Sequence, residues 1–149
     1  MKPRWHILCG IIFGLIIFIV FPEINLLYLL LIFLSAVLID FDHYMVFVLK
    51  TGRISLFNSF KWYEEQLKKE AEERRNNIKR KGHFHSLHTI EFHILVYLLG
   101  YLWVGFFYVF IGMVFHSICD FVWLIWKDRL YKREYFFMNW AGKNAKKNI

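Results

Sequence analysis

The lysines and arginines of this 149-residue chain are confined to three segments, and this segregation is the strongest constraint on its fold. Residues 2–4 hold two of the 19 basic side chains, residues 50–81 hold ten and residues 127–147 hold seven. Hydrophobic residues make up 58% of the chain, against about 45–50% in a soluble domain. The composition excludes a disordered chain, and two cysteines within apolar runs exclude a disulfide scaffold. It predicts a small basic membrane protein with a single domain, residues 1–149.

Four apolar stretches predict an all-α membrane protein with about four transmembrane helices. Their expected bounds are residues 7–21, 26–39, 87–101 and 106–126. Each is near or below the roughly 20 residues that a perpendicular span needs, so a half-inserted helical hairpin is the alternative. The segments outside the spans are a charged insert, residues 51–82, and a basic tail, residues 127–149.

The charge pattern also predicts the topology. All lysines and arginines lie in the two termini and the central insert, so the positive-inside rule places these three segments in the cytoplasm of an integral membrane protein of the cell or inner membrane. Within the insert, Phe60–Lys81 is expected to form a charged helix at the membrane surface, in contact with membrane lipids or a cytoplasmic protein partner. Interspersed glutamates argue against nucleic acid.

Ionisable side chains lie within or beside the apolar stretches, where they are costly and therefore candidates for function. The metal-ligand candidates are His6, Asp40, Asp42, His43, His83, His88, His116 and Asp120. His116 and Asp120 are four residues apart, and Asp40 and His43 three apart, so each pair shares one face of a helix. The topology, inferred from lysine and arginine alone, puts all these groups in the cytoplasmic half of the membrane. We therefore expect them to meet.

Imidazole nitrogen with carboxylate oxygen is the ligand set of zinc, manganese and iron(II), and zinc is favoured here. The number of candidates exceeds what one ion needs, so a cluster of two or three ions is predicted. Asp40 and Asp42 are also candidates for a catalytic general base. His85 and Glu91, at three-residue steps from His88, are expected to orient a ligand. His85 also fits an added ligand, and Glu91 a helix-start carboxylate.

Less specific interpretations compete at several positions. His6, beside Trp5, is also typical of a residue at the membrane interface. Residues 40–43 also fit a simple cap at the end of the second span. His93 lies off the three-residue ladder and is interpreted as structural.

Taken in order, the motifs resemble the YdjM family of membrane-bound metal-dependent hydrolases, which is also described as LexA-binding and inner-membrane-associated. His6 resembles the early histidine of that family. Leu38–His43 resembles its Leu-Pro-Asp-x-Asp-His motif, with Ile39 in place of proline. His83–Thr89 is similar to its next motif and keeps the five-residue step between two histidines, and His116–Asp120 matches its His-x-x-x-Asp.

The resemblance implies a distant similarity to zinc-dependent phospholipase C and single-strand nucleases. Those proteins are all-helical and bind three zinc ions through His and Asp, which implies hydrolysis of a phosphoester, including one at a lipid headgroup. Phe84 stands where the family has arginine, so one phosphate-binding group is missing. Leu87 and Thr89 replace the family's threonine and serine near the second histidine.

The resulting hypothesis is a membrane-bound metal-dependent hydrolase that cleaves a phosphoester with a metal-activated water. The alternative is a non-enzymatic metal-binding or regulatory membrane protein that docks a cytoplasmic partner through the charged insert. A transporter or proton relay ranks third, because the outer half of the bundle offers only Glu23, Asn25 and aromatic side chains.

Overall fold

The computed structural model describes residues 3–145, and within them the chain is helical with no strand. Its α-helices are α1 (Pro3–Val20), α2 (Leu26–Leu38), α3 (Phe41–Thr51), α4 (Leu56–Arg75), α5 (Ile90–Leu99), α6 (Gly105–Trp126) and α7 (Phe137–Ala145). Single 3-10 turns at Ser86–His88 and Leu130–Lys132 precede α5 and α7. The predicted all-α fold class is confirmed.

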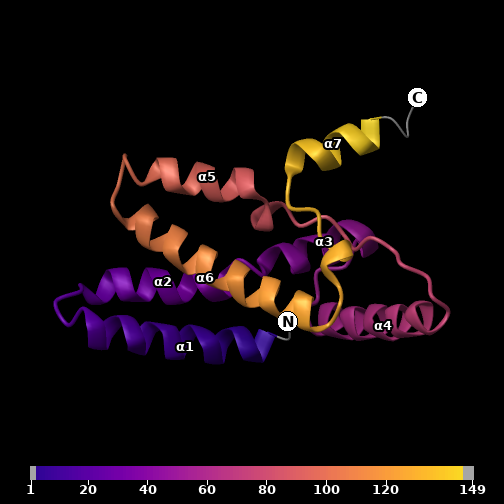
Figure 1. Ribbon diagram of the computed structural model, residues 1–149, viewed down its shortest axis with the longest axis horizontal. Coiled ribbons are helices and arrows are strands. Elements are labelled where there is room, and N and C mark those ends of the chain that lie inside the picture. The colour runs from indigo at the N-terminus through magenta and orange to yellow at the C-terminus, as the bar shows by residue number, and fades with distance from the viewer. Residues whose placement is uncertain (1–2, 146–149) are drawn as a thin grey trace.

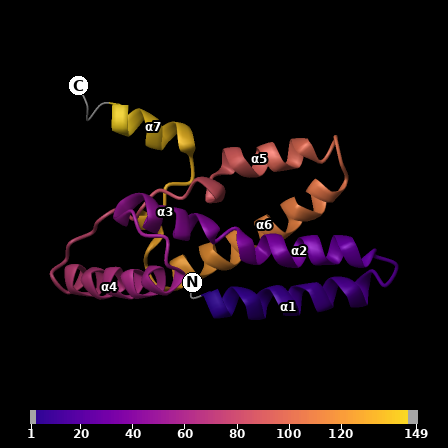
Figure 2. The ribbon, with the colours of Figure 1, turned by 180° about the vertical axis from the view of Figure 1, so that it is seen from behind.

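Four apolar helices form the bundle (Figures 1 and 2). α1 and α2 lie side by side as an antiparallel hairpin, α6 makes its most extensive contact with α2, and α5 packs on α6. α3 continues from the end of α2, and α4 lies beside α3, outside the bundle. α7 lies apart from the bundle, beyond the start of α5.

The outer surface of the bundle is apolar. Ile19 and Leu26, near the α1–α2 turn, are each 75% exposed, and Leu102, between α5 and α6, is 82% exposed. Two helical stretches, Leu26–Thr51 and Gly105–Trp126, are long and apolar enough to cross a membrane by length and composition. An extensive exposed apolar surface marks an interface with lipid or protein, and together with these stretches it indicates membrane association.

Two predicted elements differ clearly from the structure, whereas α2 ends at Leu38, within one residue of its expected end. Ile39 and Asp40 keep αR backbone angles, and α3 then runs to Thr51, where Gly52 in the left-handed region (φ 68°) ends it. The charged helix was expected at Phe60–Lys81 but occupies Leu56–Arg75. It starts earlier because the Ser55 side chain caps it by accepting from the Asn58 N–H.

The expected third span, residues 87–101, contains a much shorter helix. α5 has ten residues and is therefore about 15 Å long, half of a roughly 30 Å hydrocarbon core. Its start is fixed by the Thr89 side chain, which accepts a hydrogen bond from the Phe92 N–H at 3.3 Å. The preceding residues form the 3-10 turn Ser86–His88, which carries His88 into the bundle instead of extending the helix.

Residues 129–138, here named the C-terminal strap, return from the end of α6 across the chain before α5. Backbone N–H groups of Gly82 and Ile90 donate to the carbonyl oxygens of Lys132 and Tyr135, each at 2.9 Å. Glu91 accepts from the N–H groups of Phe137 and Met138 at 3.0 and 3.3 Å. The strap is therefore held to the chain before α5 and to the start of α5 by hydrogen bonds of its own backbone groups between residues 132 and 138.

The α2–α6 contact depends on a glycine. A β-carbon at Gly112 would overlap the Ile32 carbonyl oxygen and the Ser35 hydroxyl oxygen of α2. The Ile32 contact is backbone, which has little freedom to move aside. The two helices can therefore approach this closely only with glycine at position 112.

We predict that Gly112→Ala destabilises the protein by about 1–3 kcal/mol, the usual cost of overpacking. Thermal unfolding of the detergent-purified protein measures the change. Gly142→Ala in α7 is the matched control, because a β-carbon there meets nothing within 4 Å. Equal melting temperatures for the two variants would contradict the close α2–α6 approach.

Candidate metal centre

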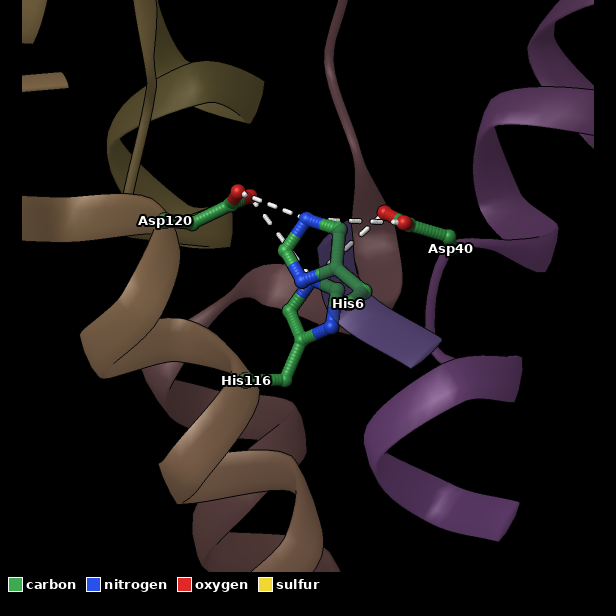
Figure 3. Close-up of side chains that lie close together, drawn as sticks. All are labelled: His6, Asp40, His116 and Asp120. Atoms are coloured by element: carbon green, nitrogen blue, oxygen red, sulfur yellow. Dashed lines mark ion pairs between the residues drawn. The ribbon is translucent and has the colours of Figure 1, made fainter. Parts of the chain in front are cut away.

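The first group of ligand candidates comes from three helical elements that are distant in sequence. His6 lies on α1, Asp40 at the α2–α3 junction, and His116 and Asp120 on α6 (Figure 3). His6 Nε2 lies 3.1 Å from Asp120 Oδ1 and 3.8 Å from Asp40 Oδ2. His116 Nε2 lies 3.6 Å from Asp120 Oδ2, and its ring stacks on that of His6 at 3.9 Å. These four side chains were expected to converge, and they lie together in the structure.

His88, from the turn before α5, forms a further group with Asp40 and His43 and also contacts His116 of the first group. The hydrogen bonds of His116 and His88 indicate where each ring carries its proton. His116 Nδ1 lies 2.7 Å from the Ala36 carbonyl oxygen, which can only accept, so Nδ1 carries the proton. His88 Nδ1 lies 2.9 Å from Asp42 Oδ2 and carries its proton for the same reason. In neutral rings, both Nε2 atoms therefore present lone pairs.

These two Nε2 nitrogens face each other at 3.2 Å, so two neutral rings would place their lone pairs in contact. Asp40 Oδ1 completes a triangle with them, 3.5 Å from His116 Nε2 and 3.7 Å from His88 Nε2. Ligand atoms bound tetrahedrally at the zinc distances of about 2.0–2.1 Å lie about 3.3 Å apart. The triangle is close to this spacing, so a divalent ion fits it and would relieve the repulsion between the lone pairs. A proton added to one ring is the other way to relieve it.

A second group lies on the other side of Asp40 and consists of Asp42, His43 and His85, whose ligand atoms are all within 4.8 Å of one another. His43 Nε2 is 3.4 Å from Asp40 Oδ1, which links the two groups. Asp42 Oδ1 and His85 Nδ1 are buried 3.3 Å apart, and neither has a hydrogen-bond partner among the described residues. A cation shared by these atoms would satisfy both.

The charge balance also favours a cation. The Asp42 and Asp120 side chains are 2% and 3% exposed, and that of Asp40 is 17% exposed. Arg133 of the C-terminal strap contacts Asp120, with its Nη2 at 2.8 Å from Oδ2. Within residues 3–145, the three carboxylates face five histidines and one guanidinium, and buried charge is unfavourable unless opposite charge is supplied. Buried His/Asp groups of this kind could hold a metal ion.

The structure brings together most of the sequence-predicted ligands. Those gathered in these groups are His6, Asp40, Asp42, His43, His88, His116 and Asp120. Asp40 also makes no side-chain capping bond at the start of α3, so its carboxylate faces the cluster instead of the helix end. His6 is 3% exposed, which places it inside the protein and not at its surface.

His83 lies outside these groups, whereas His85 lies in the second. The His83 ring stacks on Trp62 of α4, with ring centroids 5.4 Å apart, because the Gly82–Lys132 hydrogen bond holds this part of the loop beside α4 and the strap. Burial and the neighbouring charge of His85 lower the pKa of His83. The histidine that this part of the loop contributes to the cluster is therefore His85, two residues after the predicted ligand His83.

Glu91 and His93 are used in other ways. Both carboxylate oxygens of Glu91 accept backbone N–H groups of the strap, so Glu91 fastens a segment instead of orienting a histidine. His93 Nδ1 donates to the Thr89 carbonyl oxygen at 2.8 Å, and its Nε2 lies 3.0 Å from Ser117 Oγ. This hydrogen bond joins α5 to α6, as expected of a structural histidine.

Sequence reasoning missed two residues next to the cluster. Arg133 was counted only as part of a basic tail. Tyr63 of α4 donates a hydrogen bond to the His43 carbonyl oxygen at 2.7 Å, and burial together with the charges of Asp42 and Asp40 raises the pKa of its hydroxyl. In the sequence, Tyr63 is marked only by its three-residue spacing from Phe60, which puts both side chains on one face of the predicted charged helix. Nothing local distinguished Arg133 from its basic neighbours.

Comparisons of this chain with protein-family models, curated proteins and solved structures find no match. The function of this chain is therefore inferred from the geometry of its side chains.

We predict that the detergent-purified protein binds zinc or manganese and that His116→Ala/Asp120→Ala abolishes this binding, because the double change removes two donor atoms of the first group. Elemental mass spectrometry measures the ion content per chain. His93→Ala is the matched control and should retain the metal. A wild-type protein that stays metal-free after incubation with both ions would refute the site.

We also predict that His85→Ala lowers the metal content or affinity while His83→Ala does not. Of these two histidines, His85 lies within reach of Asp42, whereas His83 stacks on Trp62. Zinc titration with a competing chromogenic chelator compares the two variants. The reverse order would show that the loop before α5 is placed differently around the cluster.

Proposed function

We propose that this protein is a membrane-embedded, metal-dependent hydrolase of phosphoesters. The observation that carries the proposal is the pair of Nε2 nitrogens of His88 and His116, which face each other at 3.2 Å beside Asp40. Such an arrangement is suited to a divalent cation, and carboxylate–imidazole sites with room for more than one ion are typical of phosphoester hydrolysis. Zinc is the favoured ion, and manganese and iron(II) are the alternatives.

The proposed membrane topology has four apolar helices, with both termini and α4 in the cytoplasm. The complete segregation of lysine and arginine supports it. α1 and α2 would form one membrane-inserted hairpin and α5 and α6 the other, and α5, at about 15 Å, would reach only halfway through the hydrocarbon core. The cluster would then lie at the cytoplasmic ends of the helices, where water and polar substrates have access.

Each residue of the cluster has a defined part in this proposal. His6, Asp40, His88, His116 and Asp120 would hold one ion, and Asp42, His43 and His85 a second, with Asp40 between them. Bound ions would neutralise phosphoryl oxygens and activate a water molecule. Asp42 orients His88 through its Nδ1–H, which fixes the ring with Nε2 toward the site. His43, whose side chain is 33% exposed, lies on the open side of the cluster.

The resemblance to the YdjM family agrees with this proposal on the positions of seven ligand candidates. It disagrees at the third motif, where the structure favours His85 over His83. Phe84, in place of the family's arginine, packs its ring on Trp140 of α7 at 4.2 Å and thus has a structural use. Membership of this family stays a proposal.

One observation favours the non-enzymatic alternative. Phe57 and Phe60 at the start of α4 are 78% and 59% exposed, on a helix outside the apolar bundle. Exposed aromatic side chains next to a charged helix fit either the membrane surface or a cytoplasmic protein partner. If the protein binds metal but has no hydrolase activity, the exposed start of α4 becomes the candidate functional surface.

We predict that the metal-loaded protein hydrolyses a phosphodiester, and that Asp120→Asn lowers the rate at least about 100-fold through loss of a metal ligand. Release of nitrophenol from bis(p-nitrophenyl) phosphate, and of headgroups from phospholipid vesicles, measures activity. Asp128→Asn is the matched control, since asparagine tolerates the left-handed backbone there (φ 51°). A metal-loaded wild type that is inactive on both substrates would refute the hydrolase.

A further inference from the structure

The C-terminal strap places one arginine against the cluster. Arg133 Nη2 lies 2.8 Å from Asp120 Oδ2, and the Arg133 side chain is only 11% exposed. Asp120 Oδ2 in turn lies 3.6 Å from His116 Nε2, the atom that faces His88. The guanidinium is therefore separated from the first metal position by a single carboxylate group.

The other basic residues of the strap point elsewhere. Arg129 and Lys132 both pair with Glu70 of α4. Arg133 lies between backbone hydrogen bonds made by its neighbours Lys132 and Tyr135, to Gly82 and Ile90. The backbone on both sides of Arg133 is thus fixed, and its direction differs from that of Arg129 and Lys132. These contacts hold the Arg133 side chain beside the cluster.

The ion pair with Asp120 uses only part of the hydrogen-bonding capacity of the Arg133 guanidinium. A guanidinium has five N–H donors in a planar fork, and the contact with Asp120 Oδ2 engages one edge of it. An anion bound at the neighbouring ion position would lie beside the remaining donors. Arginine is also the side chain best suited to phosphate, because its fork matches two phosphate oxygens at once.

We propose that Arg133 binds the phosphoryl group of the substrate and positions it against the metal cluster. This inference rests on the proposed function and adds the group that recognises the substrate. The ligand is an anionic phosphoryl group, carried by either a lipid headgroup or a soluble phosphoester. Recognition is thereby assigned to the strap, while the ions are held by the bundle and by the loop before α5.

The test compares Arg133→Gln with Arg129→Gln in the metal-loaded, detergent-purified protein. Orthophosphate binding, measured by isothermal titration calorimetry, should weaken about tenfold to a hundredfold in Arg133→Gln, as expected for loss of a charged hydrogen bond. Arg129→Gln removes the same charge from the same strap but faces Glu70, so its affinity should match the wild type. Arg133→Lys keeps the charge without the fork and should fall between the two.

Two further measurements separate the possible results. Metal content by mass spectrometry should be unchanged in Arg133→Gln; a loss of metal would show that Arg133 only supports Asp120 and would overturn the inference. Unchanged phosphate affinity in Arg133→Gln would overturn it too, while leaving the hydrolase proposal intact. A wild type that binds no metal would instead refute the proposed function on which the inference rests.

Mixed micelles of phosphatidic acid distinguish the two sources of the phosphoryl group. If the substrate is a lipid, the wild type should bind these micelles more tightly than orthophosphate, and Arg133→Gln should lose the difference. If it is soluble, the two affinities should be similar, and both should fall in Arg133→Gln. Binding of either probe that is indifferent to Arg133 would contradict the assignment. Arg133→Lys serves for these comparisons should Arg133→Gln fail to fold.

Discussion

Three aspartate carboxylates share one buried volume, and the rest of the structure is arranged around the need to compensate their charge. Asp40, Asp42 and Asp120 come from two parts of the chain, and five histidines and one arginine surround them. Such a concentration of charge is unfavourable in a protein interior unless opposite charge is supplied. The bundle provides nitrogen ligands on one side and the C-terminal strap a guanidinium on the other. A divalent cation, which these side chains could hold, would add further positive charge to the same volume.

The sequence predicted this arrangement better than it predicted the helices. Positions such as His116 and Asp120 were identifiable because an ionisable pair inside an apolar run has few structural uses. Their convergence was predicted from the distribution of lysine and arginine, which is expected to place one end of every span on the same side of the membrane. Helix ends depend on single capping contacts, such as Ser55 and Thr89, whose effect is apparent only once the backbone is placed. This is why α4 and α5 differ from their expected bounds.

The misplaced residues share one cause. His83, His85 and Arg133 lie on loops, where helical periodicity gives no information about direction. The hydrogen bond between Gly82 and Lys132 joins residues fifty positions apart, and it decides that His83 faces α4 and His85 the cluster. Arg133 was missed for the same reason, since its position depends on the strap's contacts with Gly82 and Ile90. Long-range backbone contacts of this kind cannot be inferred from one sequence.

The spread of the ligands along the chain has a consequence for biosynthesis. His6 is synthesised well before Asp120 and its partner Arg133. The cluster therefore cannot be complete until α6 has been made. An ion bound across residues 6–120 closes a long loop, which restricts the unfolded chain more than a local contact would. If the proposed ion binds there, its supply would set how soon a newly made chain closes around the cluster.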